Sequence, residues 1–566
     1  MKHEFVVRPG ADPSRIRLRW RGASSVGVEP DGAMLVRTPT SSLRDERPYS
    51  YEDVDGERRE VVSCYALHDE GAGGTEYGFR TDPYDPTRTL VIDPVQIVYA
   101  TYIGTSYDDR GLGVAVDAKG AAYVTGRIAS ATTMSYDAYV VKVAPDGASF
   151  VYVTMIGGEG RDEGFDIAVD REGAAYVVGP ASSDDFPTPH GADTTFGGGQ
   201  CDAFVAKVSP AGALVFASFI GGSGTDFAEG VAVDAQGNVY VEGPTTSTEQ
   251  TLPVRVGPDL TQNGGWDLFV AKLSADGGKF QYVGFVGGAD DDVGTVRMVT
   301  SGHIAVDREG AAYVSGMTKS TEATFPGGSG FGALPSWDRT HNGAFDAFAV
   351  KVRPDGTGLV WAGYIGGDAD DSGFGMAVDR EGNAYLTGQV ESAEATFPTG
   401  QGFGDLPGLD KTYAGGVDGF LVEIRADGTK LKWASYFGGS RLDYGQAVAL
   451  DPGGDLWVTG HVESPDFTVI DGPDLTFNGP ATDGDAFVAR WSPDGAKLLS
   501  CGFIGGAGDD HAYWLAIDPA GGVYVVGDTP SNEATFPDGN GMASRRGKDR
   551  KHHGGLDAFL VKLSTK

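Results

Sequence analysis

The stretch that decides the fold is TYIGTSYDDRGLGVAVDAKGAAYVTG, residues 101–126, followed after a short connection by DAYVVKVAPDG, residues 137–147. The same order of segments returns six more times, and the last copy runs from Leu498 to Leu563. Each copy has an apolar run ending in glycine, one or more acidic residues, and β-type segments separated by Gly-containing turns. A period of about 50 to 75 residues with four β-type segments is typical of a propeller blade.

The two ends of the repeat region predict how the ring closes. The chain stops after a third-strand segment, DAFLVKLSTK, and enters the region with an outer-strand segment, QIVYATYIG, at residues 96–104. Pairing these two segments leaves no open sheet edge. We therefore predict an all-β fold: a seven-bladed β-propeller over residues 95–566, closed by pairing of an N-terminal outer strand with the last blade. Its repeats start near residues 98, 151, 214, 280, 359, 431 and 498.

Residues 1–94 lie outside the repeat. Short alternating segments such as EFVVRPG, RIRLRWRG and EYGFRT are separated by Gly, Pro and Asp, as expected for strands and turns. This region is predicted to form a small β-sandwich-like domain.

Composition excludes several classes of protein. The formal net charge of −35 disfavours nucleic-acid binding. No run approaches the roughly 18 apolar residues that a membrane span needs, so no membrane-spanning helix is expected. The three cysteines, Cys64, Cys201 and Cys501, occupy unlike repeat contexts and predict no disulfide framework. The first residues, MKHEFVVRPG, lack the apolar segment of a signal peptide.

The combination TYIGTSYDD…GVAVDAKGAAYVTG…DAYVVKV, with Phe-Pro pairs in the long connections, resembles the bacterial SBBP family of β-propeller repeats. The N-terminal stretch EFVVRPGADPSRIRLRW…YDPTRTLVIDP resembles the β-rich domain that commonly precedes such repeats. The resemblance implies a secreted or cell-surface bacterial propeller, and it supplies no catalytic residues.

Acidic residues follow the glycines in every copy, and the strand order predicts that they gather on one face of the ring. One interpretation is that each carboxylate caps its own loop by accepting backbone N–H bonds. The other is calcium, which prefers carboxylate and carbonyl oxygens. The Asp290–Asp292 run is the favoured single position. The full set of candidate metal ligands is Asp109, Asp162, Asp226, Asp290, Asp291, Asp292, Asp371, Asp443 and Asp510.

Long connections between the second and third strands are the other informative feature, because loops of this length bind something or cover an edge. Their aromatic residues are candidates for stacking on sugar rings, or for anchoring the loop to its own blade. These residues are Trp266, Phe331, Trp337, Phe403 and Tyr413. One connection carries a basic run, residues 544–553. It is interpreted either as a solvated loop tip or as a binding site for an anionic partner.

Histidines are scattered, and only His303 and His511 lie near first strands, where they would approach the axial channel. No companion ligand is evident from spacing, so no zinc site is predicted.

The leading hypothesis is a non-enzymatic propeller scaffold that binds a protein or carbohydrate through loops on one face, with calcium as its only expected cofactor. Two alternatives stay open: a structural subunit of a larger extracellular assembly, and a hydrolase or lyase with a site at the axial mouth. The sequence leaves the oligomeric state undetermined.

Overall fold

Antiparallel β-sheets make up both units of this chain. The computed structural model describes residues 5–564 except 21–22, 30–31, 33, 39–41, 46–47, 49, 55–56, 72–73, 93–95, 130–134, 294–303 and 480–483. The chain divides into a unit of Met1–Gln96 with Thr565–Lys566 and a second unit of Ile97–Ser564. The predicted boundary at residues 94 and 95 and the candidate His303 lie outside the described residues.

The first unit contains three small sheets around one apolar core. Val36, Tyr65 and Leu90, one from each sheet, pack in this core. The sheets have the orders β1-β10-β6-β7, β2-β9-β8 and β3-β4-β5. The strands are β1 (Phe5–Val7), β2 (Leu18–Trp20), β3 (Ser25–Val28), β4 (Met34–Arg37), β5 (Ser42–Asp45), β6 (Ser50–Val54), β7 (Glu57–Glu60), β8 (Ser63–Gly71), β9 (Gly74–Thr81) and β10 (Leu90–Ile92).

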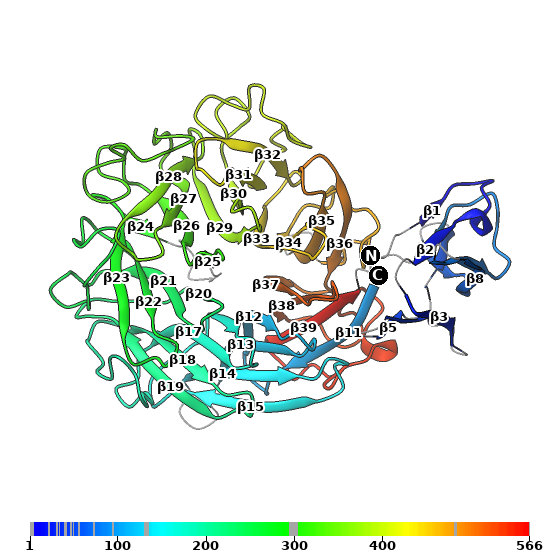
Figure 1. Cartoon of the computed structure of the whole chain (residues 1–566), viewed down its shortest axis with the longest axis horizontal. Helices are drawn as coiled ribbons and strands as arrows, with labels where there is room; N and C mark the ends of the chain where they lie inside the picture. The colour runs from blue at the N-terminus through cyan, green and yellow to red at the C-terminus, as the bar shows by residue number, and fades with distance from the viewer. Residues whose placement is uncertain are drawn as a thin grey trace. The chain divides into compact units, whose positions relative to one another are not determined.

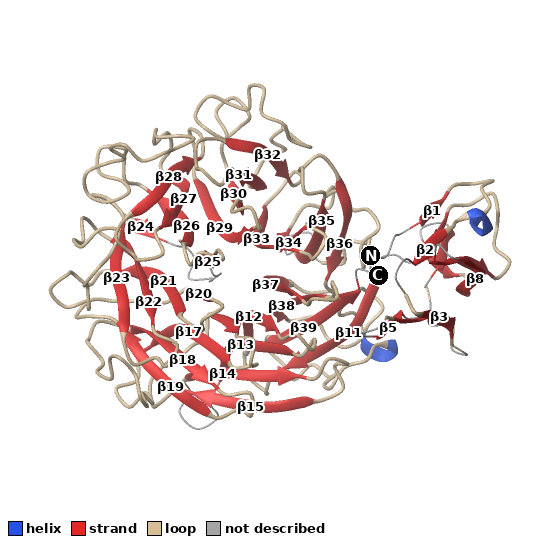
Figure 2. Ribbon diagram, viewed as in Figure 1, coloured by secondary structure: helices blue, strands red, loops and turns tan. Residues whose placement is uncertain are grey.

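The second unit is a propeller, and its described residues supply seven antiparallel sheets set around a ring (Figures 1 and 2). Blade 1 contains β12 (Arg110–Val116), β13 (Ala122–Ala129), β14 (Tyr136–Val143) and β15 (Phe150–Ile156). Blade 2 contains β16 (Asp166–Val169), β17 (Ala175–Ala181), β18 (Asp202–Val208) and β19 (Leu214–Ile220). Blade 3 contains β20 (Gly230–Val233), β21 (Val239–Thr245), β22 (Asp267–Leu273) and β23 (Phe280–Val286).

The remaining blades follow the same order. Blade 4 contains β24 (Asp292–Val293), β25 (Ile304–Val306), β26 (Ala312–Thr318), β27 (Asp346–Val352) and β28 (Leu359–Ile365). Blade 5 contains β29 (Asp371–Val378), β30 (Ala384–Val390), β31 (Asp418–Ile424) and β32 (Leu431–Phe437). Blade 6 contains β33 (Asp443–Leu450), β34 (Leu456–Val462), β35 (Asp485–Trp491) and β36 (Leu498–Ile504). Blade 7 contains β37 (His511–Ile517), β38 (Val523–Thr529), β39 (Asp557–Ser564) and β11 (Gln96–Ile103).

Ring closure follows the prediction. The last blade has the order β11-β39-β38-β37, so the entering strand pairs with the final one. The predicted all-β propeller is therefore confirmed. The helical elements among the described residues are two short 3-10 turns, η1 (Pro13–Arg15) and η2 (Met542–Ser544). No helix among those residues has the length and apolar character needed to cross a membrane.

Three repeated residues explain why the blades hold together. In blade 1, Asp117 accepts N–H bonds from its hairpin turn at 2.9 and 3.0 Å, and Tyr123 Oη donates to it at 3.2 Å. Lys142 Nζ bonds Tyr123 Oη at 2.6 Å. The same hydroxyl also lies within hydrogen-bond distance, 3.0 Å, of the Gly173 carbonyl of blade 2. The repeated Val-Asp, Tyr and Lys of the sequence thus tie a hairpin to its own blade and to the next one.

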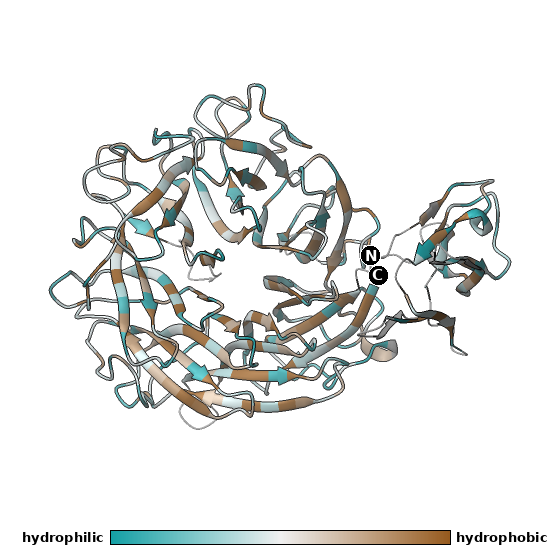
Figure 3. Ribbon diagram, viewed as in Figure 1, coloured by the Kyte–Doolittle hydropathy of each residue, from teal (hydrophilic) through white to brown (hydrophobic). Residues whose placement is uncertain are grey.

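Apolar residues fill the space between neighbouring blades. One cluster joins Val177 of blade 2 to Val140 of blade 1, and comparable clusters join blades 2 and 3, 3 and 4, 4 and 5, 5 and 6, and 7 and 1. Figure 3 shows these apolar residues concentrated on the strands and hydrophilic residues in many loops. The core therefore lies between the blades and leaves the loop-bearing ends free for function.

Candidate functional sites

Seven aspartates after the glycine loops are fully buried, one in each blade. Each accepts a backbone N–H bond from the residue four positions earlier, as Asp371 does from Gly367 at 2.7 Å. The second oxygen of Asp371 accepts N–H bonds from the end of the blade's second strand at 3.2 Å. These residues thus cap loops, as one of the two sequence interpretations has it. They are Asp109, Asp162, Asp226, Asp292, Asp371, Asp443 and Asp510.

A second aspartate lies at the start of each third strand and faces the first one; it is buried in six blades, whereas Asp137 of blade 1 is half-buried. In blade 3, a Cβ built on Gly287 would lie 2.5 Å from Asp267 Oδ1 and 3.0 Å from Asp292 Oδ2, so both oxygens face one glycine. Among the described residues Asp267 Oδ1 has no hydrogen-bond partner, whereas its Oδ2 accepts the N–H of Asn263 at 2.9 Å. Burial raises the pKa of Asp267 to about 8, and the carboxylate of Asp292 adds to the rise.

The same pairing recurs around the ring. Burial is the first cause of the raised pKa in each case, and the neighbouring carboxylate raises it further. The pairs are Asp137 with Asp162, Asp202 with Asp226, Asp267 with Asp292, Asp346 with Asp371, Asp418 with Asp443, Asp485 with Asp510, and Asp557 with Asp109.

The Asp290–Asp292 run does not converge on one point. Asp290 is exposed, and Asp291 forms an ion pair with Lys319 at 3.3 Å. Asp292 turns inward and accepts bonds from Gly288 N at 2.7 Å and Ser320 Oγ at 2.9 Å. The residues that follow, 294–303, lie outside the described part of the chain.

Long second-to-third connections run along the outer strands of their own blades. In blade 2, the carbonyls of Pro189 and Asp193 accept the outward N–H groups of Ala217 and Phe219, both at 3.0 Å. The basic run 544–553 does the same in blade 7, where Arg546 and Asp549 accept from Ala100 and Tyr102 at 3.0 Å. The backbone of this run therefore covers β11, while the side chains of Arg546, Lys548, Arg550 and Lys551 are exposed to solvent.

The candidate aromatic residues mostly anchor these loops. Phe331 and Phe403 are only 5% and 8% exposed, and each packs on a tyrosine of its outer strand. Trp337 donates its indole N–H to the Tyr364 carbonyl at 2.5 Å. Tyr413 contacts Tyr436, and Trp266 contacts Phe227 at the inner end of blade 3. The structure therefore brings no two of these five rings into a shared sugar-stacking platform among the residues it describes.

Blade 1 differs from the others at its outer strand. Its second-to-third connection spans only residues 130–135, between β13 and β14. Val153 and Met155 on β15 are 54% and 46% exposed. The corresponding residues of the other six outer strands are at most 2% exposed; they are Ala217, Phe219, Val283, Phe285, Ala362, Tyr364, Ala434, Tyr436, Cys501, Phe503, Ala100 and Tyr102. No bond from another described residue covers the outward N–H groups of Val153 and Met155.

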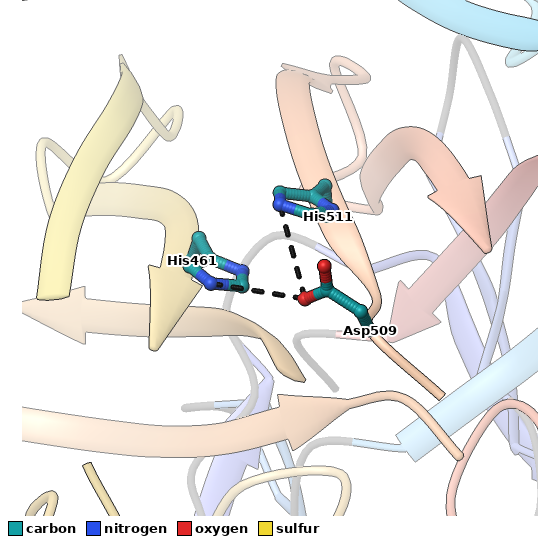
Figure 4. Close-up of side chains that lie close together, drawn as sticks. All are labelled: His461, Asp509 and His511. Carbon is teal, nitrogen blue, oxygen red and sulfur yellow. Dashed lines mark ion pairs between the residues drawn. The ribbon is translucent and has the colours of Figure 1, made fainter. Parts of the chain in front are cut away.

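A histidine cluster lies at the inner end of the junction between blades 6 and 7 (Figure 4). His461 is on β34, His511 opens β37, and Asp509 lies in the loop between β36 and β37. Asp509 Oδ1 is 3.9 Å from Nε2 of each histidine. The two rings are stacked, with centroids 4.3 Å apart and planes 6° from parallel. Among the described residues, this is the group of His, Cys, Asp or Glu side chains spaced to hold a metal ion.

Buried charges continue from this cluster into the next junction. His511 Nδ1 lies 3.7 Å from Asp528 Oδ1, and the other oxygen of Asp528 pairs with Arg110 at 3.1 Å and accepts from Tyr513 at 3.1 Å. Burial lowers the pKa of His511 to about 4, helped by His461, and burial raises the pKa of Asp528 to about 6. At the following junction, Arg127 pairs with Glu163 at 3.0 Å.

Sequence reasoning noted His511 and missed His461. The two histidines are 50 positions apart and occupy different strands of successive blades, so no local spacing links them. The signal was present in the repeat: His461 follows the Trp-Val-Thr-Gly segment of one copy, and His511 follows the acidic pair of the next. The equivalent positions also meet at two other junctions, as Arg127 with Glu163 and as Asp528 with Arg110.

The fold and these sites define a β-propeller protein with a separate β-rich unit. Residues 360–389 match the family described as "Beta-propeller repeat" (SBBP), and residues 1–95 match a domain of unknown function, DUF7948. The chain therefore carries an SBBP repeat preceded by a DUF7948 domain, as the resemblance of its sequence predicted.

Comparisons with individual proteins are more distant. The regulatory protein FlaEY of Caulobacter vibrioides is 25% identical over 348 residues, which cover 59% of this chain and 33% of that protein. The chain thus matches a third of the length of this relative. Among solved structures, Sqt1 of Chaetomium thermophilum has a TM-score of 0.37 at 10% identity, covering 76% of this chain and 96% of Sqt1. The extracellular domain of BT4673 from B. thetaiotaomicron has a TM-score of 0.34 at 9% identity, covering 95% and 51%.

Proposed function

We propose that this protein is a non-enzymatic scaffold that binds an extended segment of a partner protein along β15, outside the cell or on its surface. The observation that carries the proposal is the exposed apolar edge of blade 1. An uncovered edge strand pairs readily with another chain, because its backbone N–H and carbonyl groups have no partner. Partners that add a strand gain backbone hydrogen bonds from the edge and specificity from alternate side chains.

The other blades support a peptide segment as the occupant. In each of them, a segment of the chain's own loop supplies two carbonyls to the outer strand, as Pro335 and Asp338 do for Ala362 and Tyr364 at 3.2 Å. Blade 1 presents the same edge without such a segment among its described residues. The partner that fits is an extended, polar segment with an apolar side chain for the Val153–Met155 surface.

The test uses a double variant, Val153→Lys with Met155→Lys, and a matched control, Val215→Lys. Val215 is also apolar and 42% exposed, but its strand β19 is covered by its loop. Photo-crosslinking through a reactive residue at position 151 captures partners from the native cell, and mass spectrometry identifies them. We expect the double variant to lose at least nine-tenths of the captured partner, because two lysines place charge on the surface that the partner must desolvate.

The control should capture the partner as the wild type does. Equal capture by the wild type and the double variant would rule out β15 as the docking strand. Light scattering measures the molar mass of the wild type and of the double variant. A dimer formed by the wild type and not by the double variant would identify a second copy of this chain as the occupant.

Calcium binding is a second candidate, and the unpartnered Oδ1 atoms favour it. Six third-strand aspartates of the described structure carry such an oxygen beside a second carboxylate. A calcium ion that binds only the folded state must raise its stability. At pH 8 we expect 5 mM calcium to raise the melting temperature by a few degrees over a sample in EDTA. A melting temperature that calcium leaves unchanged would count against a calcium site. An equal rise with 5 mM magnesium would count against selectivity for calcium.

A further inference from the structure

We propose that His461, His511 and Asp509 form a binding site for one divalent transition-metal ion of the zinc class, at the inner end of the junction between blades 6 and 7. The site is independent of the β15 surface. Two imidazole nitrogens and one carboxylate oxygen are a donor set that suits zinc and its neighbours, and three protein ligands leave coordination positions open.

The spacing of the three ligand atoms is close to what such an ion requires. Zinc–nitrogen and zinc–oxygen bonds of about 2.0–2.2 Å place tetrahedral ligand atoms roughly 3.3 Å apart. Both histidine Nε2 atoms are 3.9 Å from Asp509 Oδ1, so each pair must close by roughly half an ångström. His511 must also turn out of its stacked arrangement with His461 and Tyr513; its side chain is 26% exposed.

Each histidine already has an acceptor near its other nitrogen. His461 Nδ1 lies 3.3 Å from the Asp510 carbonyl, and His511 Nδ1 lies 3.7 Å from Asp528 Oδ1. A proton on Nδ1 leaves the Nε2 lone pair free to bind a metal, and such second partners are typical of metal-bound histidines. Asp528 is itself held by Arg110 and Tyr513. The bond to the Asp510 carbonyl favours the His461 tautomer that a metal needs, and the nearby carboxylate of Asp528 favours a proton on Nδ1 of His511.

Asp509 and Gly484 complete the arrangement. The N–H of Gly484 bonds Asp509 Oδ1 at 3.0 Å and so fixes the carboxylate toward the histidines. A Cβ on Gly484 would lie 2.3 Å from His461 Cε1 and 2.6 Å from its Nε2, so only glycine leaves space for the ring. The corresponding residues before the third-strand aspartate of the other blades are larger: Tyr136, Cys201, Trp266, Phe345, Val417 and Leu556. The glycine therefore occurs where the histidine needs room.

A further carboxylate is near enough to join the site. Glu463 Oε1 lies 3.9 Å from His461 Nε2, and its side chain is 30% exposed. It can serve as a fourth ligand or accept a proton from a water molecule in an open position.

The test measures zinc and cobalt binding by the full chain after dialysis against a chelator. Isothermal titration with zinc should give one site with a dissociation constant in the micromolar range or tighter. Cobalt bound by the same ligands should give visible absorption that zinc displaces. His511→Ala and Asp509→Asn should each weaken zinc binding at least 30-fold; the asparagine keeps an oxygen that can accept the Gly484 N–H bond.

Two further variants separate the site from a general loss of structure. His190→Asn changes an exposed histidine with φ of +57°, which asparagine tolerates, and it should bind zinc as the wild type does. Gly484→Val should displace the His461 ring and lose the tight site while melting temperature shows a folded propeller. The proposal is overturned if the wild type shows no one-to-one zinc site with a dissociation constant below 100 µM. It is also overturned if His511→Ala and Asp509→Asn bind zinc as tightly as the wild type.

Discussion

The melting temperature of this protein is expected to fall as the pH rises from 5 to 8 in calcium-free buffer. Burial raises the pKa of many ring carboxyls, to about 7 for Asp202 and to about 8 for Asp346. In this pH window the folded protein holds protons that the unfolded chain, with ordinary carboxyl pKa values, has already released. Stability therefore decreases with increasing pH, because the native state binds more protons. The large negative charge of the chain acts in the same direction.

The expected effect is large because the pair recurs in every blade. One retained proton in each of the five pairs whose carboxyl pKa rises to about 7 or 8 gives a total on the order of 10 kcal/mol, at about 1.4 kcal/mol for each unit of pKa shift. With an unfolding entropy of about 2.1 cal/mol/K per residue, the melting temperature should drop by roughly 10 °C. Carboxylates with a lowered pKa, such as the ion-paired Asp117 and Asp307, stabilise the folded state while they are ionised, and this stabilisation is lost only below about pH 5. Stability should therefore be greatest near pH 5.

Calorimetry at constant ionic strength measures this effect. Asp202→Asn should flatten the pH dependence and stabilise the protein at pH 8, since the amide is neutral and still accepts the Gly197 N–H bond. Asp276→Asn is the matched control: it changes an exposed turn aspartate whose hydrogen bonds to Ser274 lower its pKa, and it should leave the slope between pH 5 and 8 unchanged. A melting temperature that rises from pH 5 to pH 8 would refute proton sharing by the buried pairs.

The fold was largely predictable because most blades repeat the same physical solution. The set formed by Asp117, Tyr123 and Lys142 recurs in blades 2, 3, 4 and 7, so its pattern is visible in one sequence even though blades 5 and 6 vary it. The pairing of β11 with β39 was predictable too, because two incomplete copies at the ends can satisfy each other. The seven loop aspartates were found for the same reason, and their caps match the simpler of the two interpretations.

The candidate functional sites depend on departures from the repeat, and these are harder to read. Phe331 and Phe403 look like exposed loop aromatics, but the loops fold back and bury them against Tyr364 and Tyr436. The sequence shows that the connection of copy one is short. It does not show that long connections cover the outer strands of the other blades, so the exposure of Val153 could not be predicted from it. His461 meets His511 only once the ring places consecutive blades side by side.

Removing β11 is expected to open the ring. A chain beginning at residue 104 lacks five apolar side chains that are at most 7% exposed in the closed ring: Ile97, Tyr99, Ala100, Tyr102 and Ile103. Their burial contributes roughly 10 kcal/mol at 1.5–3 kcal/mol for each large side chain. The loss also uncovers the edge of β39, which then pairs with other molecules. We expect a melting temperature at least 10 °C lower and concentration-dependent association by light scattering.

The matched control is a chain beginning at residue 96, which keeps β11 and lacks only the preceding unit. It should keep the oligomeric state of the full chain and melt as the propeller of the full chain does. A synthetic peptide of residues 95–105, added to the shorter chain, should restore the melting temperature, because β11 is held by β39 and by the loop carbonyls of Arg546 and Asp549. Equal melting of the two truncated chains would mean that closure contributes little. Rescue by the peptide would show that noncovalent contacts of β11 are enough to close the ring, since the added strand has no covalent link to the blade it completes.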